Sequence, residues 1–138
     1  MANFEKLYED SILPLRKTKT AAGYDFYAHE EMDILPHSRG MVKTGVSCKL
    51  ADNEYLAVTP RSGLAVKKGV TVLNTPGTVD SDYYPGEICV ILFNTSDEVF
   101  HVQPGDRIAQ GIINQYITTE NDNVEDTERN GGFGSTDR

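Results

Sequence analysis

The residues best suited to chemistry lie in a short run rich in glycine and proline, Asn74–Ile88, which contains the carboxylates Asp80 and Asp82. Apolar segments stand on both sides of this run, at 70–73 and 88–92. This order of strand, turn and strand predicts a β-hairpin with Asp80 near its tip. Because glycine has no side chain, such a hairpin can bring its backbone close to a flat ligand. The alternative is a solvent-facing turn whose aspartates only stabilise the turn.

A second candidate site is Arg61-Ser62-Gly63, which follows a strand-like stretch ending at Thr59. Arginine can bind an anion through two parallel hydrogen bonds, and Ser62 can donate to another oxygen of the same anion. Gln110 follows a Pro-Gly-Asp turn and can donate to a phosphate or to a metal-bound water. A solvated arginine and an exposed polar strand residue are the alternatives for Arg61 and Gln110.

A third candidate is the glycine-rich segment Arg129–Thr136, which begins with an arginine and carries one aromatic residue, Phe133. Its backbone amides can surround phosphates, and the phenyl ring can stack on a base. The segment lacks the Gly-Lys-Ser/Thr ending of a Walker loop. A disordered tail is the alternative.

Composition limits the classes of protein to consider. The chain has 138 residues, 38% hydrophobic and 25% charged, which predicts one globular domain with a buried core. It contains no long apolar run, and its first ten residues lack the apolar core of a signal peptide, so we expect a cytoplasmic protein without a membrane contact. Cys48 and Cys89 lie in apolar, strand-like stretches, which favours two buried, reduced thiols over a disulfide.

The charge of the chain is negative and unevenly distributed. The net charge of −8 argues against nonspecific binding of nucleic acid, which requires a basic surface. Residues 119–138 contain six acids and two arginines, a local net charge of −4. An anionic ligand therefore needs a local site with arginine and a divalent cation. The three histidines, His29, His37 and His101, have no spacing typical of a metal site or of a Ser-His-Asp triad.

Turn signals recur every eight to twelve residues, and helical periodicity is nearly absent. Strands are expected within 4–12, 21–28, 41–50, 55–59, 70–73, 88–92, 99–102 and 108–117. The one expected helix is Leu64–Lys68, closed by Gly69. The pattern predicts an all-β fold, a jelly roll or β-sandwich-like barrel with one short helix, over residues 1–118. Residues 119–138 are expected to form a mobile C-terminal arm.

Five short motifs occur in a fixed order along the chain: AAGYDFYA, PRSGLA, N-x-x-G-T-V-D-S-D-Y, GDRIAQ and R-N-GGFGST. They resemble the five motifs of the trimeric dUTPase family and extend from Ala21 to Thr136. The resemblance implies a homotrimeric β jelly roll with three active sites at subunit contacts, where the arm of one subunit closes over a site built by its neighbours. It also implies Mg²⁺-assisted hydrolysis of dUTP to dUMP and pyrophosphate, by attack of water on the α-phosphorus. This reaction limits uracil incorporation into DNA and supplies dUMP for thymidylate synthesis.

The resemblance also implies roles for individual residues. Asp80 would orient or deprotonate the attacking water, Tyr83 would pack against the deoxyribose, and Asp25 would hold Mg²⁺ through water. The phosphate chain would contact Arg61, Ser62, Gly63, Gln110 and Arg129, with Ser62 near the α–β bridging oxygen and Arg129 at the γ-phosphate. The uracil would contact Asn74, Gly77, Thr78, Val79, Phe133 and Gly134, with Phe133 over its face.

Two departures from the family pattern leave alternatives open. The run DSDYYPG is one residue longer than the usual D-x-D-Y-x-G, so Tyr84 competes with Tyr83 for the sugar. The arm is one residue short between Arg129 and Phe133, which leaves Phe93 as an alternative cover for the uracil. Whether Asp80 is a full base or a hydrogen-bond acceptor is also open.

Two other functions compete with dUTP hydrolysis. Deoxycytidine triphosphate deaminase shares the fold, but no matching glutamate motif is present. A nucleotide-dependent role in binding another protein, through the acidic arm, is compatible with the sequence.

Overall fold

Closely spaced turns divide the chain into short extended segments, and the computed structural model describes residues 1–125, 129 and 131–134. The elements are β1 (Asn3–Lys6), β2 (Tyr24–Tyr27), β3 (Met32–Ile34), β4 (Arg39–Lys43), β5 (Val46–Lys49), β6 (Glu54–Thr59), α1 (Ser62–Lys68), β7 (Val70–Val72), β8 (Gly77–Asp80), a 3₁₀ turn (Ser81–Tyr83), β9 (Cys89–Asn94), β10 (Phe100–Val102) and β11 (Arg107–Gln115). The expected all-β class with one short helix is confirmed within these residues.

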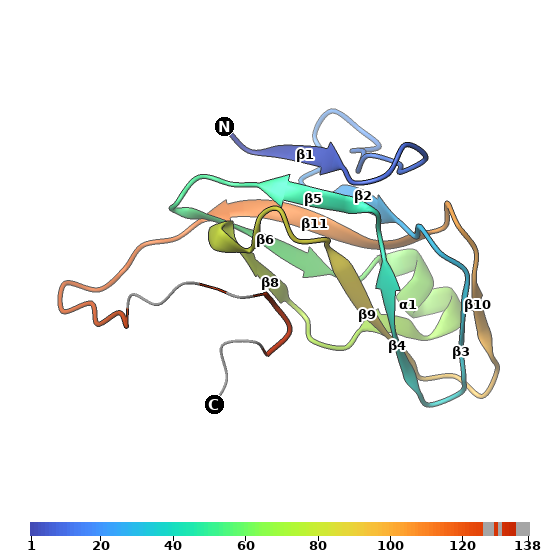
Figure 1. Cartoon of the computed structure of the whole chain (residues 1–138). Coiled ribbons are helices and arrows are strands. Elements are labelled where there is room, and N and C mark those ends of the chain that lie inside the picture. Colours follow the sequence, from blue (N-terminus) through green and yellow to red (C-terminus); the bar gives the residue numbers. More distant parts are fainter. Residues whose placement is uncertain (126–128, 130, 135–138) are drawn as a thin grey trace.

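Two antiparallel sheets contribute most of the core (Figure 1). One has the strand order β2-β11-β6-β8, and the other has the order β4-β9-β7. The pairs β1-β5 and β3-β10 complete the strand pairing. Within the described residues these four sheets do not close into a barrel, so the barrel of the sequence prediction is not observed.

The core lies between the two larger sheets, since one cluster of buried side chains includes members of both. Its largest members from the four-stranded sheet are Phe26, Leu56 and Ile108, and those from the three-stranded sheet include Val42, Val90 and Leu92. Buried Asn94 ends β9, and its amide donates to the carbonyl oxygens of Ile34 and Glu98 at 3.0 and 2.7 Å. These bonds satisfy a polar group that would otherwise destabilise the core.

The run Asn74–Ile88 differs from the predicted hairpin. Its flanking strands β7 and β9 do pair with each other, with Val72 opposite Leu92. The connection between them is not a tight turn, however, because it contains β8, which pairs with β6 in the other sheet. Asp80 ends β8 instead of lying at a hairpin tip. The sequence prediction was wrong because the partner of β8 lies in another sheet, and local periodicity carries no information about such a partner.

Three further points of the sequence prediction need correction or refinement. The predicted strand 41–50 is two strands, because Gly45 adopts a positive φ of 73° between β4 and β5. The sequence reading did not predict β3. Helix α1 begins at Ser62, two residues earlier than expected, and ends at Gly69 with a left-handed φ of 66° as predicted.

Both cysteines are free thiols, as predicted, but only Cys48 is fully buried. Burial raises the pKa of Cys48 to about 12 and that of the half-buried Cys89 to about 11. Neither thiol is therefore readily ionised near neutral pH.

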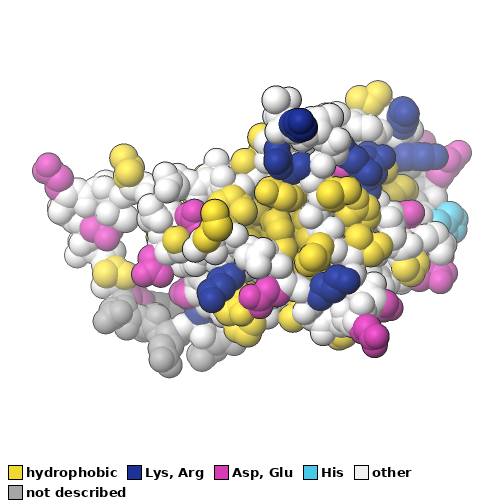
Figure 2. Space-filling model, turned by 90° about the horizontal axis from the view of Figure 1, so that it is seen from above, with side chains coloured by type: hydrophobic (Ala, Val, Ile, Leu, Met, Phe, Trp, Pro, Cys, Tyr) yellow, Lys and Arg dark blue, Asp and Glu magenta, His cyan; other side chains and the backbone are white. Residues whose placement is uncertain are grey.

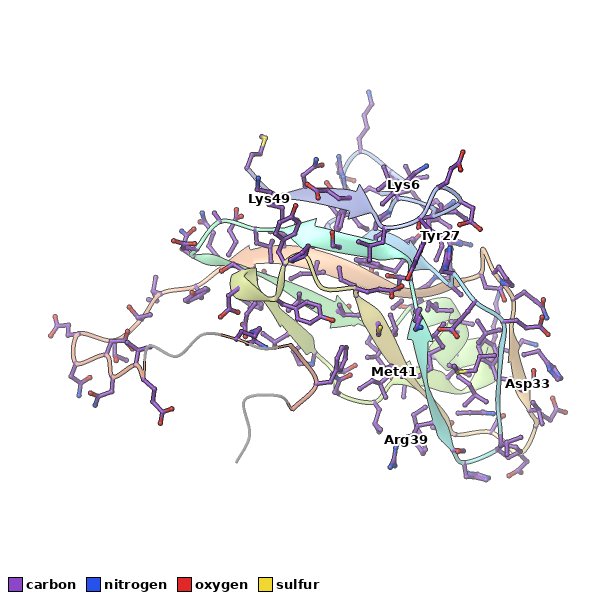
Figure 3. All side chains as sticks on the ribbon, in the orientation of Figure 1. Lys6, Tyr27, Asp33, Arg39, Met41 and Lys49 are labelled. Carbon is purple, nitrogen blue, oxygen red and sulfur yellow. The ribbon has the colours of Figure 1, made fainter. Side chains whose placement is uncertain are left out.

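Charged side chains occupy outer positions of the strands, as Figure 3 shows for Lys6, Asp33, Arg39 and Lys49. An apolar area interrupts this surface on the face seen from above in Figure 2, where lysines and arginines border it. Figure 1 places the segment between β1 and β2 on that side, and this segment exposes Leu7, Ile12, Leu13 and Leu15. An exposed apolar area of this kind is typical of an interaction surface. None of the described helices has the length and apolar character needed to cross a bilayer.

Candidate active site

A pocket opens beside β8, where the two larger sheets and the returning arm meet. Its walls come from β6, β7, β8, the 3₁₀ turn, β9 and the arm. The lining includes Val58, Val72, Asn74, Gly77, Thr78, Val79, Asp80, Tyr83, Cys89, Ile91, Arg129, Gly132 and Phe133. Apolar side chains form the walls and a few polar groups lie among them, the composition typical of a small-molecule site.

One edge of the pocket is backbone. Among the described strands β8 is the last of its sheet, because it pairs with β6 on one side only. In such a strand the amides and carbonyls of alternate residues have no ladder partner. The free edge can therefore hydrogen-bond a flat polar ring lying in the plane of the sheet.

Tyr83 forms a second wall, and its ring is tightly held. A Cβ added to Gly86 or to Gly132 would lie 2.6 Å from the nearest atom of the ring, so the ring contacts both glycines closely. Its hydroxyl donates to the carbonyl oxygen of Glu87 at 2.5 Å. Burial raises the pKa of the Tyr83 phenol, which keeps the hydroxyl protonated as a donor.

The two aromatic alternatives left open by the sequence occupy different places. Tyr83 lines the pocket, whereas the hydroxyl of Tyr84 donates to Oε1 of Glu5 on β1 at 2.7 Å. Phe133 also lines the pocket and meets the Tyr83 ring edge-on, with ring centroids 6.2 Å apart and planes at 87°. Phe93 on β9 is not among the lining residues.

Arg129 closes the pocket by pairing with both carboxylates of the run. Its Nη2 lies 2.7 Å from Oδ2 of Asp80, and its Nε lies 2.7 Å from Oδ1 of Asp82. The Arg129 side chain is 19% exposed and that of Asp80 is 53% exposed, so water screens this pair from the carboxylate side. Arg129 thus contacts Asp80, the carboxylate that the family resemblance assigns to the attacking water.

A second cluster of polar residues lies near the start of β11. Gln110 pairs with Asp25 on β2 and with Thr59 on β6 in the strand register, and its amide donates to the carbonyl oxygen of Pro60 at 3.1 Å. Arg107 Nη1 lies 3.4 Å from Oδ2 of Asp25. The Arg107 carbonyl in turn accepts a hydrogen bond from Nη1 of Arg61 at 3.2 Å. This cluster therefore combines two cationic side chains with one carboxylate and one amide.

The remaining predicted site residues lie outside the pocket. Ser62 and Gly63 are exposed at the first turn of α1, next to Arg61. Gly134 follows Phe133 with a positive φ of 95° and does not line the pocket. Within the motif Arg129–Thr136, residues 130, 135 and 136 lie outside the described residues, as do 126–128, 137 and 138 of the predicted arm.

The pocket and the second cluster lie far apart in one chain. Asp25, Gln110 and Thr59 form one row across the sheet, while Asp80 stands opposite Tyr55, four residues further along β6 and three strands from Asp25. With strands about 4.8 Å apart and residues rising about 3.4 Å each, Asp80 and Asp25 are roughly 20 Å apart. One chain does not place these groups around a common atom.

Asp25 could bind a magnesium ion that takes most of its other ligands from water and substrate. Its side chain is 14% exposed and supplies a single carboxylate. Among residues 1–125, 129 and 131–134, no group of three or more His, Cys, Asp or Glu side chains is arranged to hold a metal. Mg²⁺ commonly binds through one or two carboxylates, several waters and the phosphates of a substrate. A single carboxylate such as that of Asp25 could therefore hold Mg²⁺ only together with waters and phosphates.

Several of these contacts were not predicted from the sequence. They are the pairing of Asp82 with Arg129, the bond between Tyr84 and Glu5, and the pair of Arg107 with Asp25. Only Asp82 could have been singled out from the local sequence, because it lies two residues after Asp80 in the run Asn74–Ile88. The other two contacts join segments 79 and 82 residues apart.

The fold and the two clusters define an all-β protein with a pocket for a flat ring and a separate group of side chains suited to an anion. A family model described as dUTPase matches residues 9–137. A deoxyuridine 5'-triphosphate nucleotidohydrolase from Wolinella succinogenes is 47% identical over 135 residues, which is 95% of this chain and 90% of that protein. The chain belongs to the dUTPase family, as its five motifs predicted, and the relatives that it matches are named as hydrolases.

Solved structures agree with this assignment. The dUTPase from Streptococcus mutans has a TM-score of 0.79 and 32% identity, and the match covers 85% of this chain and 98% of that one. A variant of the Staphylococcus bacteriophage 80alpha dUTPase with dUpNHpp also has a TM-score of 0.79, with 25% identity over 99% of this chain and 98% of that one.

Proposed function

We propose that this protein hydrolyses dUTP to dUMP and pyrophosphate by attack of water on the α-phosphorus. The observation that carries the proposal is the pocket beside β8, where a free strand edge, the ring of Tyr83 and the carboxylate of Asp80 meet. The names of the relatives support the same substrate, as does the dUpNHpp complex of the bacteriophage protein.

The pocket accounts for the choice of base and sugar. The backbone of Gly77–Val79 and the side chain of Asn74 would hydrogen-bond the edge of uracil, and Phe133 would cover its face. Because the Tyr83 ring is fixed by two glycines and by Glu87, it would pack against the deoxyribose and leave no room for a 2′-hydroxyl. Tyr84 is bonded to Glu5, so Tyr83 is the better candidate for this role.

Asp80 would orient the attacking water and accept its proton. Its side chain is 53% exposed, so water can reach it from outside the pocket. Arg129 now holds one of its oxygens, and substrate phosphates would draw this guanidinium away from Asp80. Exchange of Arg129 from the carboxylate to the γ-phosphate would free Asp80 as the pocket closes.

The phosphate chain would bind at the second cluster. Arg61 and Ser62 would contact the phosphate oxygens, with Ser62 near the α–β bridging oxygen, and Gln110 would donate from β11. Asp25 would hold Mg²⁺ through water, and a bound Mg²⁺ would stabilise the charge that develops on the leaving pyrophosphate.

The separation of the two groups supports a shared site in a homotrimer. A water held by Asp80 must meet the phosphate chain that binds with Mg²⁺ at Asp25, whereas roughly 20 Å separates these two carboxylates in one chain. A pocket of one subunit next to the phosphate cluster of another resolves this conflict. In this structure the arm contacts the pocket of its own chain, whereas the family resemblance implies an arm that closes over a site built by neighbouring subunits. The exposed apolar area near Leu13 and Leu15 would supply part of the subunit contact. The two free thiols fit a cytoplasmic location, which we retain as part of the proposal.

Product analysis tests the proposal. The purified protein is mixed with Mg²⁺ and, separately, with dUTP, dCTP, dTTP and UTP. We expect dUMP and pyrophosphate from dUTP and little product from the other three. Release of ammonia from dCTP would assign the protein to the deaminase branch. Tight binding of dUTP without turnover would favour a nucleotide-dependent role in binding another protein.

A further inference from the structure

The adjacent residues Tyr83 and Tyr84 point to different parts of the molecule. Tyr83 lines the pocket, whereas Tyr84 reaches β1, where its hydroxyl donates to Oε1 of Glu5 at 2.7 Å. Tyr84 and Glu5 are both half-buried, so solvent competes only partly for their hydrogen bond. The extra residue in DSDYYPG thus leaves the pocket and joins the loop to the N-terminal strand.

The segment Ser81–Ile88 rests on the same part of the fold through further bonds. Oε2 of Glu87 accepts from the amide of Gly45 at 2.8 Å, and the amide of Ile88 donates to the carbonyl of Val46 at 2.9 Å. These bonds fix the C-terminal end of the segment. The hydrogen bond from the Tyr84 hydroxyl to Glu5 holds the middle of the segment.

The pose of the Tyr83 ring depends on this segment. The ring contacts Gly86 closely, and the Tyr83 hydroxyl donates to the carbonyl of Glu87. Both groups belong to the same loop, so a shift of the loop by a few tenths of an ångström moves the ring with it. Groups in such close contact transmit shifts to one another instead of absorbing them.

We propose that Glu5 and Tyr84 are positioning residues that hold the Ser81–Ile88 loop against β1. They thereby fix the Tyr83 ring in the position where it discriminates between deoxyribose and ribose. The inference rests on the proposed function, because it assigns these residues a part in the selection of dUTP over UTP. Neither residue touches the pocket, so they act through Tyr83 and not on the nucleotide.

The tether persists over the working pH range of most enzymes. The hydrogen bond to Glu5 is the main cause that raises the pKa of the Tyr84 phenol. The protonated hydroxyl that donates to the carboxylate is therefore retained well above neutral pH.

The experiment compares kcat/KM for dUTP and UTP in three variants. Tyr84→Phe removes the donor, Glu5→Ala removes the acceptor, and the double variant removes both. We expect each single variant to lower the dUTP-to-UTP ratio by about threefold to tenfold, the effect of losing one hydrogen bond. Because both substitutions break the same bond, the double variant should lower the ratio no further. An unchanged ratio in Tyr84→Phe, or additive effects in the double variant, would overturn the proposal.

Two controls separate positioning from general stability. Glu5→Gln keeps an acceptor oxygen, so it should retain the wild-type ratio within about twofold. Tyr116→Phe loses a hydroxyl that donates at 2.7 Å to the carbonyl of Asp52. Tyr116 does not line the pocket, so this variant should leave the ratio unchanged. A lowered ratio in Tyr116→Phe would show that any lost tyrosine bond has this effect, which also contradicts the proposal.

A readout independent of turnover keeps the inference apart from the proposed function. The amides of Gly86 and Ile88 both donate hydrogen bonds at the end of the loop, to Tyr83 and Val46. Faster hydrogen exchange of the Gly86 amide in Tyr84→Phe, with exchange in β6 unchanged, supports the tether even if wild-type protein hydrolyses neither nucleotide. Unchanged exchange at Gly86 would refute it, whatever the activity.

Discussion

The pocket beside β8 and the cluster at Gln110 lie on the same four-stranded sheet but consist of different kinds of chemical group. The pocket consists of a free strand edge, packed rings and glycines that allow close contact. The cluster consists of side chains with charge or hydrogen-bonding capacity, namely Asp25, Arg61, Arg107 and Gln110. Shape therefore dominates at the first site, and charge dominates at the second.

This difference separates selection of the nucleotide from handling of its phosphates. Substitutions that alter the pocket should change which base and sugar are accepted. Substitutions in the cluster should slow hydrolysis of every accepted nucleotide equally, since all triphosphates present the same charges. Asp80 and Arg129 connect the two functions, because both lie in the pocket yet carry charge.

The largest effect is expected for Asp80→Asn. The amide keeps the shape of the side chain but cannot accept a proton from water, so we expect kcat to fall by roughly 10²- to 10⁴-fold. Binding of the non-hydrolysable analogue dUpNHpp, measured by calorimetry, should change by no more than about threefold. Near-normal kcat in this variant would exclude Asp80 as base or water-holder.

Arg129→Ala should have the next largest effect. Loss of a preorganised cation at the phosphates is expected to lower kcat/KM by about 10²- to 10³-fold. Arg39→Ala is the matched control, because Arg39 is exposed on β4 and does not line the pocket. Equal losses in the two variants, measured in the same steady-state assay, would argue that only the net charge of the protein matters.

Gly23→Ala tests the phosphate cluster through its geometry. A Cβ at Gly23 would overlap the side-chain oxygen of Gln110 and lie 3.2 Å from its amide carbon, so Gln110 must move. We expect kcat/KM to fall by about tenfold to 10²-fold, as is usual for a misplaced catalytic contact. The dUTP-to-UTP ratio should not change, because the pocket is untouched. A changed dUTP-to-UTP ratio would show that the phosphate cluster also affects the choice of sugar, against the separation of roles between the two sites.

The smallest effect concerns a pair outside both sites. The hydrogen bond from His29 at 2.9 Å lowers the pKa of Asp10 below 3.8 in the folded protein. Because folding lowers the pKa of Asp10, the stabilisation from this pair is present above pH 3.8. It is lost as the pH falls through the pKa of Asp10 in the folded protein. Urea unfolding between about pH 5 and about pH 3 should therefore show a slightly smaller loss of stability in Asp10→Asn than in wild type. Identical pH profiles would show that the pair contributes nothing, in line with many exposed ion pairs.

Local chemistry was enough to predict much of the fold and the site. Glycine and proline marked the turns, short apolar stretches between turns marked strands such as β6 and β11, and Gly69 marked the end of α1. The five motifs contain some of the residues that line the pocket, including Asn74, Asp80 and Tyr83.

Long-range pairing was the part that local patterns could not supply. β8 is extended like a hairpin strand, but its partner β6 lies in another sheet, so the predicted hairpin was wrong. Likewise, nothing near Tyr84 indicates that its hydroxyl reaches Glu5, 79 residues away. The roles of Asp80, Arg129 and Asp25 in catalysis stay predictions until they are measured.

Complementation between two inactive variants tests most directly the central claim that the pocket of one subunit works with the phosphate cluster of another. Asp80→Asn protein and Arg61→Ala protein are mixed in equal amounts, unfolded and refolded together, and assayed with dUTP. If sites are shared, random assembly should restore about one quarter of wild-type activity, because half of the pockets and half of the clusters are intact. Activity no greater than the sum of the two separate variants would show that each chain builds its active site alone.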